Sequence, residues 1–206
     1  SCNYCSTISL VGQVNELKLL TKFESRVTIE VTYSYFNKDL TKGDGNMLRI
    51  ENLTKKFGDK TAVNNLSLHI QPGEIYGFIG HNGAGKTTTI KSVCGILQFD
   101  SGNIYVNGVS LKEDPVACKK EIAYIPDNPD LYDFMTGIKY LNFIADIYGV
   151  EASLRQERIN RYAGVFGLAN DLSQPISSYS HGMKQKLAII SALVHDPKLM
   201  IMDEPF

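Results

Sequence analysis

The chain has 206 residues, of which 43% are hydrophobic and 21% are charged, and its formal net charge is −1. This length allows one sizeable domain, and the composition is ordinary for a globular protein. The near-neutral charge predicts no nucleic-acid partner, and the longest apolar runs are far shorter than the about 20 residues of a membrane-spanning helix. A role at a membrane would therefore require a partner that supplies the helices.

The first 46 residues differ in pattern from the rest of the chain. Residues 27–33 alternate between apolar and polar side chains as a strand does, and a polar run follows from Asn37 to Asn46. No functional motif occurs in this part. Residues 1–46 are interpreted as an extension of unclear status, which is either translated upstream sequence or a genuine small addition. Met47 begins a different pattern, which predicts a domain over residues 47–206.

Short apolar strands alternate with helical segments from Met47 onward. The strands are expected at residues 48–53, 66–70, 74–79, 103–106, 122–125 and 199–202. The pair Pro72-Gly73 ends one of them with a turn signal. Helices are expected over residues 86–97, 138–148, 154–166 and 181–195, and Gly167 is expected to end the third. This order predicts an α/β fold with a helical insertion at about residues 128–180.

The segment between the 74–79 strand and the first helix matches G-x-x-x-x-G-K-[ST] in full, as Gly80-His81-Asn82-Gly83-Ala84-Gly85-Lys86-Thr87. Glycines let several backbone N–H groups point at phosphate oxygens, and the helix adds its positive N-terminal end. Lys86 is expected to bridge the β- and γ-phosphates, and the Thr87 hydroxyl to bind Mg²⁺. The predicted nucleotide-binding residues are Gly80, His81, Asn82, Gly83, Ala84, Gly85, Lys86, Thr87 and Thr88.

Two acids follow the last strand, Leu199–Met202, as Asp203 and Glu204. In an open α/β sheet, ligands bind beyond the carboxyl ends of the strands. Asp203 is therefore predicted to hold Mg²⁺, directly or through water, and Glu204 to polarise the water that attacks the γ-phosphate. Together with the phosphate loop, the acids predict Mg²⁺-dependent hydrolysis of ATP.

The segment Tyr179-Ser180-His181-Gly182-Met183, a helix and a short loop ahead of Asp203, resembles the signature sequence of ABC-type ATPases, usually Leu-Ser-Gly-Gly-Gln. The resemblance covers residues 47–206. It implies a P-loop NTPase core with an N-terminal antiparallel β subdomain and a helical insertion, truncated after the Walker B strand that precedes Asp203. It also implies that Ser180 and Gly182 contact the γ-phosphate held by a second ATPase subunit. Ser180 is equally expected to cap its helix.

The resemblance places two further residues. Phe57, in the loop after the first strand, would stack on adenine; its alternative role is that of a packed loop aromatic. The segment 123–128 is similar to the glutamine loop of the family, but Asp127 stands where glutamine is usual. Asp127 could offer an oxygen to Mg²⁺ or to the attacking water, and it is included among the catalytic residues with Lys86 and Glu204.

By resemblance, the protein is an ATP-hydrolysing subunit of an exporter, with ATP and Mg²⁺ as cofactors. Its expected partners are a transmembrane permease subunit and a second ATPase subunit, at the inner face of the cell membrane. The alternatives are a soluble ABC-type ATPase of translation or DNA maintenance and an inactive gene fragment. Family members continue beyond the position of Phe206 with further site residues. The 206-residue chain is therefore expected to bind ATP weakly and to hydrolyse it negligibly.

Overall fold

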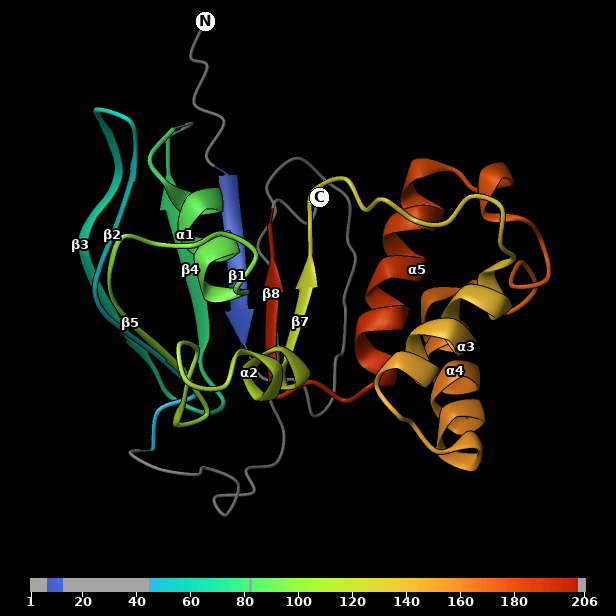
Figure 1. Cartoon of the computed structure of the whole chain (residues 1–206). Helices are drawn as coiled ribbons and strands as arrows, with labels where there is room; N and C mark the ends of the chain where they lie inside the picture. The colour runs from blue at the N-terminus through green and yellow to red at the C-terminus, as the bar shows by residue number, and fades with distance from the viewer. Residues whose placement is uncertain (1–6, 13–44, 82, 204–206) are drawn as a thin grey trace, which may run out of the picture.

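The computed structural model of the chain describes residues 7–12, 45–81 and 83–203. These residues form two four-stranded sheets and five α-helices, which Figure 1 shows as three adjoining parts. An antiparallel sheet lies at one side, a mixed sheet lies in the middle, and a group of helices lies at the other side. This arrangement confirms the predicted α/β class with an antiparallel β subdomain.

The antiparallel sheet has the strand order β3-β2-β5-β6. Its strands are β2 (Leu48–Phe57), β3 (Lys60–Ile70), β5 (Ser101–Val106) and β6 (Val109–Ser110). β2 and β3 are longer than predicted, because they form a hairpin in which Phe57 pairs with Lys60 across the Gly58-Asp59 turn. Gly58 has a φ of 57°, a backbone conformation that favours glycine. Phe57 is therefore the last residue of a strand, and its predicted position in a loop is wrong.

The mixed sheet has the order β4-β1-β8-β7. Its strands are β4 (Ile75–Gly80), β1 (Thr7–Gly12), β8 (Leu199–Met202) and β7 (Ile122–Ile125). β7 and β8 are parallel, and β1 is antiparallel to both β4 and β8. Consequently β4, β7 and β8 all end at the same edge of the sheet. The phosphate loop and Asp203 leave the sheet at this edge.

β1 comes from the segment that the sequence separates from the domain. Thr7 pairs with Gly80 and Leu10 pairs with Met202, so β1 lies between the strand of the phosphate loop and the strand of Asp203. Residues 27–33, with their strand-like alternation, lie outside the described residues. The boundary between residues 46 and 47 stays a prediction, although residues 7–12 pair with strands on the other side of it.

Two helices and the facing strands enclose one hydrophobic core. α1 (Lys86–Val93) contributes Ile90 and Val93 to it, and α2 (Pro115–Glu121) contributes Cys118. α1 is four residues shorter than the predicted 86–97 helix, since Gly95, with a φ of 63°, ends it by donating a hydrogen bond to Ser92 O at 3.1 Å. α2 was not predicted from the sequence; Asp114 caps it by accepting a hydrogen bond from Ala117 N at 2.9 Å.

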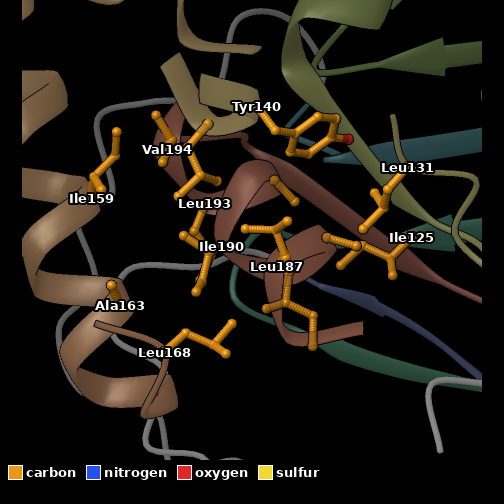
Figure 2. Packing of buried hydrophobic residues seen from close by; sticks show 14 of the residues in the cluster. Ile125, Leu131, Tyr140, Ile159, Ala163, Leu168, Leu187, Ile190, Leu193 and Val194 are labelled. Atoms are coloured by element: carbon orange, nitrogen blue, oxygen red, sulfur yellow. The ribbon is translucent and has the colours of Figure 1, made fainter. Parts of the chain in front are cut away.

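The remaining helices form a second core, shown in Figure 2. They are α3 (Gly137–Ile147), α4 (Ala152–Phe166), the short 3₁₀ helix η1 (Ile176–Ser178) and α5 (His181–Val194). Leu187 and Ile190 of α5 are fully buried among α3, α4 and the end of β7. α5 therefore joins the helical part to the mixed sheet. Within the described ranges, no helix has both the length and the apolar character that a membrane span requires.

The ends of α3 and α5 are held together by two stacked rings. The ring of Tyr148, which follows α3, lies 3.8 Å from the ring of His195, which follows α5, at an angle of 11°. Burial lowers the pKa of His195 below its ordinary value of 6.5, even though the carboxylate of Asp196 acts in the opposite direction. The folded protein therefore keeps this imidazole neutral at a pH where the unfolded chain binds a proton.

Stability is expected to fall as the pH drops below 6.5, because only the unfolded state then takes up the proton of His195. The variant His195→Phe keeps a ring against Tyr148 and cannot titrate. We expect its urea midpoint to change less between about pH 7.5 and pH 5.5 than that of the wild type. His69→Phe, at an exposed position, is the control and should leave the pH dependence unchanged. An equal loss of stability on acidification in wild type and His195→Phe would contradict this role.

Candidate active site

The phosphate loop is shaped by two glycines in a left-handed conformation. Gly83 and Gly85 have φ values of 84° and 87°. A Cβ atom at Gly85 would lie 2.3 Å from the backbone oxygen of Ala62 on β3. Only glycine allows this approach, so the loop packs directly on the backbone of the antiparallel sheet. The loop is thereby fixed between the two sheets, at the N-terminus of α1.

Lys86 occupies the centre of the loop. Its side chain is buried, with 6% exposure, and its ammonium group donates hydrogen bonds to Gly80 O and, at 3.1 Å, to His81 O. Lys86 is also the first residue of α1, and no side chain caps this helix. The first N–H groups of a helix have no partner inside the helix and carry a partial positive charge. A buried cation and a helix N-terminus thus point to the same place, which suits phosphate.

A pocket of about 370 Å³ opens beside the loop. Phe57 lines it with half of its surface exposed (51%), and the hairpin partner Lys60 lines it as well. The complete lining consists of Phe57, Lys60, Ala62, Gly83, Gly85, Lys86, Thr87 and Thr88. The structure thus brings the predicted adenine-stacking residue and the phosphate loop to one pocket. Lys60 and Ala62 were not predicted from the sequence, although the turn pair Gly58-Asp59 is a signal for the hairpin that places them.

Asp203 lies directly after β8 and is buried, with 5% exposure. Its backbone N–H donates a hydrogen bond of 2.9 Å to Ile125 O on β7. Burial, and secondarily the Asp203 carboxylate, raises the pKa of Cys94 and of Tyr124 to about 12. Because β1 lies between β4 and β8, two strand spacings, roughly 10 Å, separate the strands that carry the loop and Asp203. This separation suits a shared ion that Asp203 holds through water better than one it touches directly.

Three other predicted site residues lie apart from the pocket. Asp127 is exposed beyond the end of β7, and Ser180 and Gly182 are exposed at the start of α5. Ser180 caps this helix, as predicted, by accepting a hydrogen bond of 3.3 Å from Met183 N. Two more predicted site residues, Asn82 and Glu204, lie outside the described residues.

The residues of the pocket, together with Asp203 after β8, fit ATP and Mg²⁺. The exposed Thr87 hydroxyl and the Asp203 carboxylate are hard oxygen donors of the kind that Mg²⁺ prefers. In the described part of the chain, no group of three or more His, Cys, Asp or Glu side chains could hold a metal ion by itself. This donor set matches an ion bound by one or two protein oxygens together with substrate phosphates.

Comparison with known families identifies the chain. A family model described as ABC transporter matches residues 63–206. The chain belongs to the ABC transporter family. The predicted resemblance is therefore confirmed, and the two-sheet core with its helical part is the fold of an ABC-type ATPase subunit.

Two curated members of the ABC transporter family illustrate how similar their sequences are to this chain. The chain is 39% identical over 162 residues to the linearmycin resistance ATP-binding protein LnrL of Bacillus subtilis. It is 35% identical over 159 residues to the bacitracin transport ATP-binding protein BcrA of Enterococcus faecalis. Each match covers 77% of this chain and 51% of the relative, so the chain spans about half the length of these relatives.

A solved ATP-binding subunit of an ABC transporter superposes on the structure with a TM-score of 0.64 at 28% identity. This match covers 73% of the present chain and 63% of the solved one. A second solved chain, cbiO1 from Clostridium perfringens, superposes with a TM-score of 0.63 at 22% identity and supports the fold alone.

Proposed function

We propose that the ABC-type subunit to which this chain belongs binds and hydrolyses Mg-ATP and that this cycle drives export through a separate transmembrane permease subunit. The pocket between Phe57 and the phosphate loop carries the proposal, because it combines an aromatic face with a buried cation and a helix N-terminus. The relatives named for linearmycin resistance and bacitracin transport support a role in export.

The residues of the site have separate proposed roles in binding and hydrolysing the nucleotide. Phe57 stacks on adenine, a contact of about 1–3 kcal/mol for an aromatic ring on a base. Lys86 leaves the carbonyl oxygens of Gly80 and His81 and turns to the β- and γ-phosphates, so it offsets charge that develops there during transfer. Thr87 and Asp203 would hold Mg²⁺, which neutralises phosphate charge when bound. Glu204 is proposed to orient the attacking water, and Asp127 to assist it.

Ser180 and Gly182 are proposed to complete the site of a second ATPase subunit. Both are exposed and lie outside the pocket of their own chain. A Cβ atom at Gly182 would meet no atom within 4 Å, and the residue has no positive φ. Nothing within the described chain therefore requires glycine here, although glycine weakens a helix. Close approach of an external group, the γ-phosphate on the second subunit, explains the glycine.

The variant Gly182→Ala tests this shared site. We expect it to stabilise the folded chain, by less than the about 0.5–1 kcal/mol of a helix interior because Gly182 is the second residue of α5, since alanine is the better helix former and has free space at this position. The same variant should weaken the association of two chains that Mg-ATP induces, because its methyl group blocks the approach of the phosphate. Urea denaturation measures the first effect, and sedimentation with and without Mg-ATP measures the second. A more stable variant that associates as the wild type does would exclude Gly182 from the shared site.

The permease is proposed to dock on aromatic side chains at the outer side of the helical part, which would hold the subunit at the inner face of the cell membrane. Phe134 is 82% exposed and Tyr132 is 46% exposed. Their rings lie 5.8 Å apart, and Tyr132 also contacts Phe143 of α3 at 5.6 Å. Exposed aromatic clusters are characteristic of protein interfaces. This cluster follows Asp127 along the chain, so docking there would act on a residue that is proposed to assist the attacking water.

A further inference from the structure

Two segments of the helical part are joined along their backbones. The first, residues 133–138, follows Asp127 and leads into α3. The second, residues 171–177, leads to Ser180. Ile138 N donates to Leu172 O at 2.8 Å, and Ile176 N donates to Met135 O at 2.9 Å. Gly137 N and Ser177 N complete the pairing, each at 3.2 Å, to Gln174 O and Asp133 O.

This pairing provides hydrogen-bond acceptors for the first backbone N–H groups of α3. Gly137 and Ile138 are the first two residues of the helix, so their N–H groups have no partner inside it. The second segment supplies the missing acceptors, Gln174 O and Leu172 O. A shift of the second segment would therefore leave these two donors without their acceptors, a cost that resists separate movement of the two segments.

Tyr179 is the buried side chain at the end of the paired segments. It is 6% exposed, whereas its neighbour Ser180 is exposed. Its hydroxyl donates a hydrogen bond of 2.8 Å to Asp171 O. The same hydroxyl lies where a side chain at Gly137 would begin, since a Cβ atom there would be only 2.4 Å from it. The hydroxyl thus fills a space that exists only because residue 137 is glycine.

We propose that Tyr179 is a positioning residue, whose hydroxyl, held between Asp171 and Gly137, fixes Ser180 and the segment after Asp127 as one body. The inference rests on the proposed function in one respect, that Ser180 contacts the phosphate of a second subunit. Movement of residues 133–138, which include Phe134 of the aromatic cluster, would then reach Ser180 without a change at the phosphate loop of the same chain.

An ion pair also joins the first segment to α5 but cannot replace this contact. Lys184 of α5 lies 2.8 Å from Asp133, yet more than half of the Asp133 side chain is exposed (56%). Exposed pairs of this kind contribute little, because water and salt screen them. The buried hydroxyl of Tyr179, with its fixed partners, is the more effective constraint.

Hydrogen exchange of the full chain tests the proposal in three variants. Tyr179→Phe removes the hydroxyl and keeps the ring. Gly137→Ala keeps the hydroxyl but forces it from its place. We expect each to speed exchange at residues 180–183 and 133–138 about fivefold, the effect of losing one hydrogen bond. The double variant should be no faster than the faster single variant, because both changes remove the same contact. Exchange in the phosphate loop should stay unchanged.

Tyr162→Phe is the matched control. Tyr162 lies on α4, is half-buried and packs against the same core. Its substitution should leave hydrogen exchange at residues 180–183 unchanged. Unchanged exchange in Tyr179→Phe, additive effects in the double variant, or equal loosening of the phosphate loop would each overturn the proposal. Sedimentation with Mg-ATP separates it from the proposed function. If the exchange pattern holds while ATP brings no two chains together, Tyr179 positions Ser180 but the shared site is wrong.

Discussion

Replacing Lys86 with methionine is expected to weaken binding of Mg-ATP by about 10–100-fold. Hydrogen bonds to charged groups contribute about 1.5–3 kcal/mol each, and 1.4 kcal/mol corresponds to a factor of ten. Lys86 is the buried cation at the centre of the phosphate loop, where its ammonium is already held by Gly80 O and His81 O. Methionine fills a similar volume without the charge. Fluorescence titration with a labelled ATP measures the dissociation constant.

Lys91→Met is the matched control for this experiment. Lys91 lies on the same helix, α1, but it is exposed and does not line the pocket. The control variant should bind Mg-ATP as the wild type does. Equal affinity in wild type and Lys86→Met, or equal loss in both variants, would show that the phosphate loop does not bind the nucleotide in the way proposed.

The second large effect is expected at Gly85. Alanine there must adopt a φ near 87°, which costs an ordinary residue about 1–2 kcal/mol. Its Cβ would also lie 2.3 Å from Ala62 O, so backbone must move, at a further cost of about 1–3 kcal/mol. Gly85→Ala should therefore lower the free energy of unfolding by about 2–5 kcal/mol and disturb the pocket. Urea denaturation, followed by circular dichroism, measures this loss.

Gly83→Ala separates the cost of the backbone conformation from the cost of the close contact with Ala62. Gly83 has nearly the same φ, 84°, but a Cβ atom there would meet nothing within 4 Å. This variant should lose only the conformational part, about 1–2 kcal/mol. Equal destabilisation by the two substitutions would mean that the approach of the loop to β3 contributes nothing.

Local signals in the sequence predicted the parts of the site that depend on neighbouring residues. The glycines and Lys86 occur in one continuous motif, whose strand and helix context was predicted as well. β7 and β8 have the predicted bounds, because each is a short apolar run with clear ends. The cap at Ser180 was also predicted, since it needs only the sequence of one helix start.

Features that depend on distant residues could not be predicted in this way. β1 pairs with strands some 70 and 190 positions further along, and its six residues carry no signal for these partners. Lys60 reaches the pocket only through the hairpin with Phe57. The fit between Tyr179 and Gly137 likewise requires the three-dimensional arrangement. α2 is a different case, because Asp114-Pro115 is a local helix-start signal from which this helix could have been predicted.

The binding of ATP at the phosphate loop can be tested most directly by titrating the ¹⁵N-labelled chain with Mg-ATP and following its amide signals by NMR. We expect the largest shifts at Gly83, Gly85 and residues 86–88, whose N–H groups surround the proposed phosphate position. Smaller shifts are expected near Phe57 and Lys60, on the adenine side of the pocket. Shifts confined to other parts of the chain, or no saturable shifts at the loop, would contradict the proposed nucleotide site.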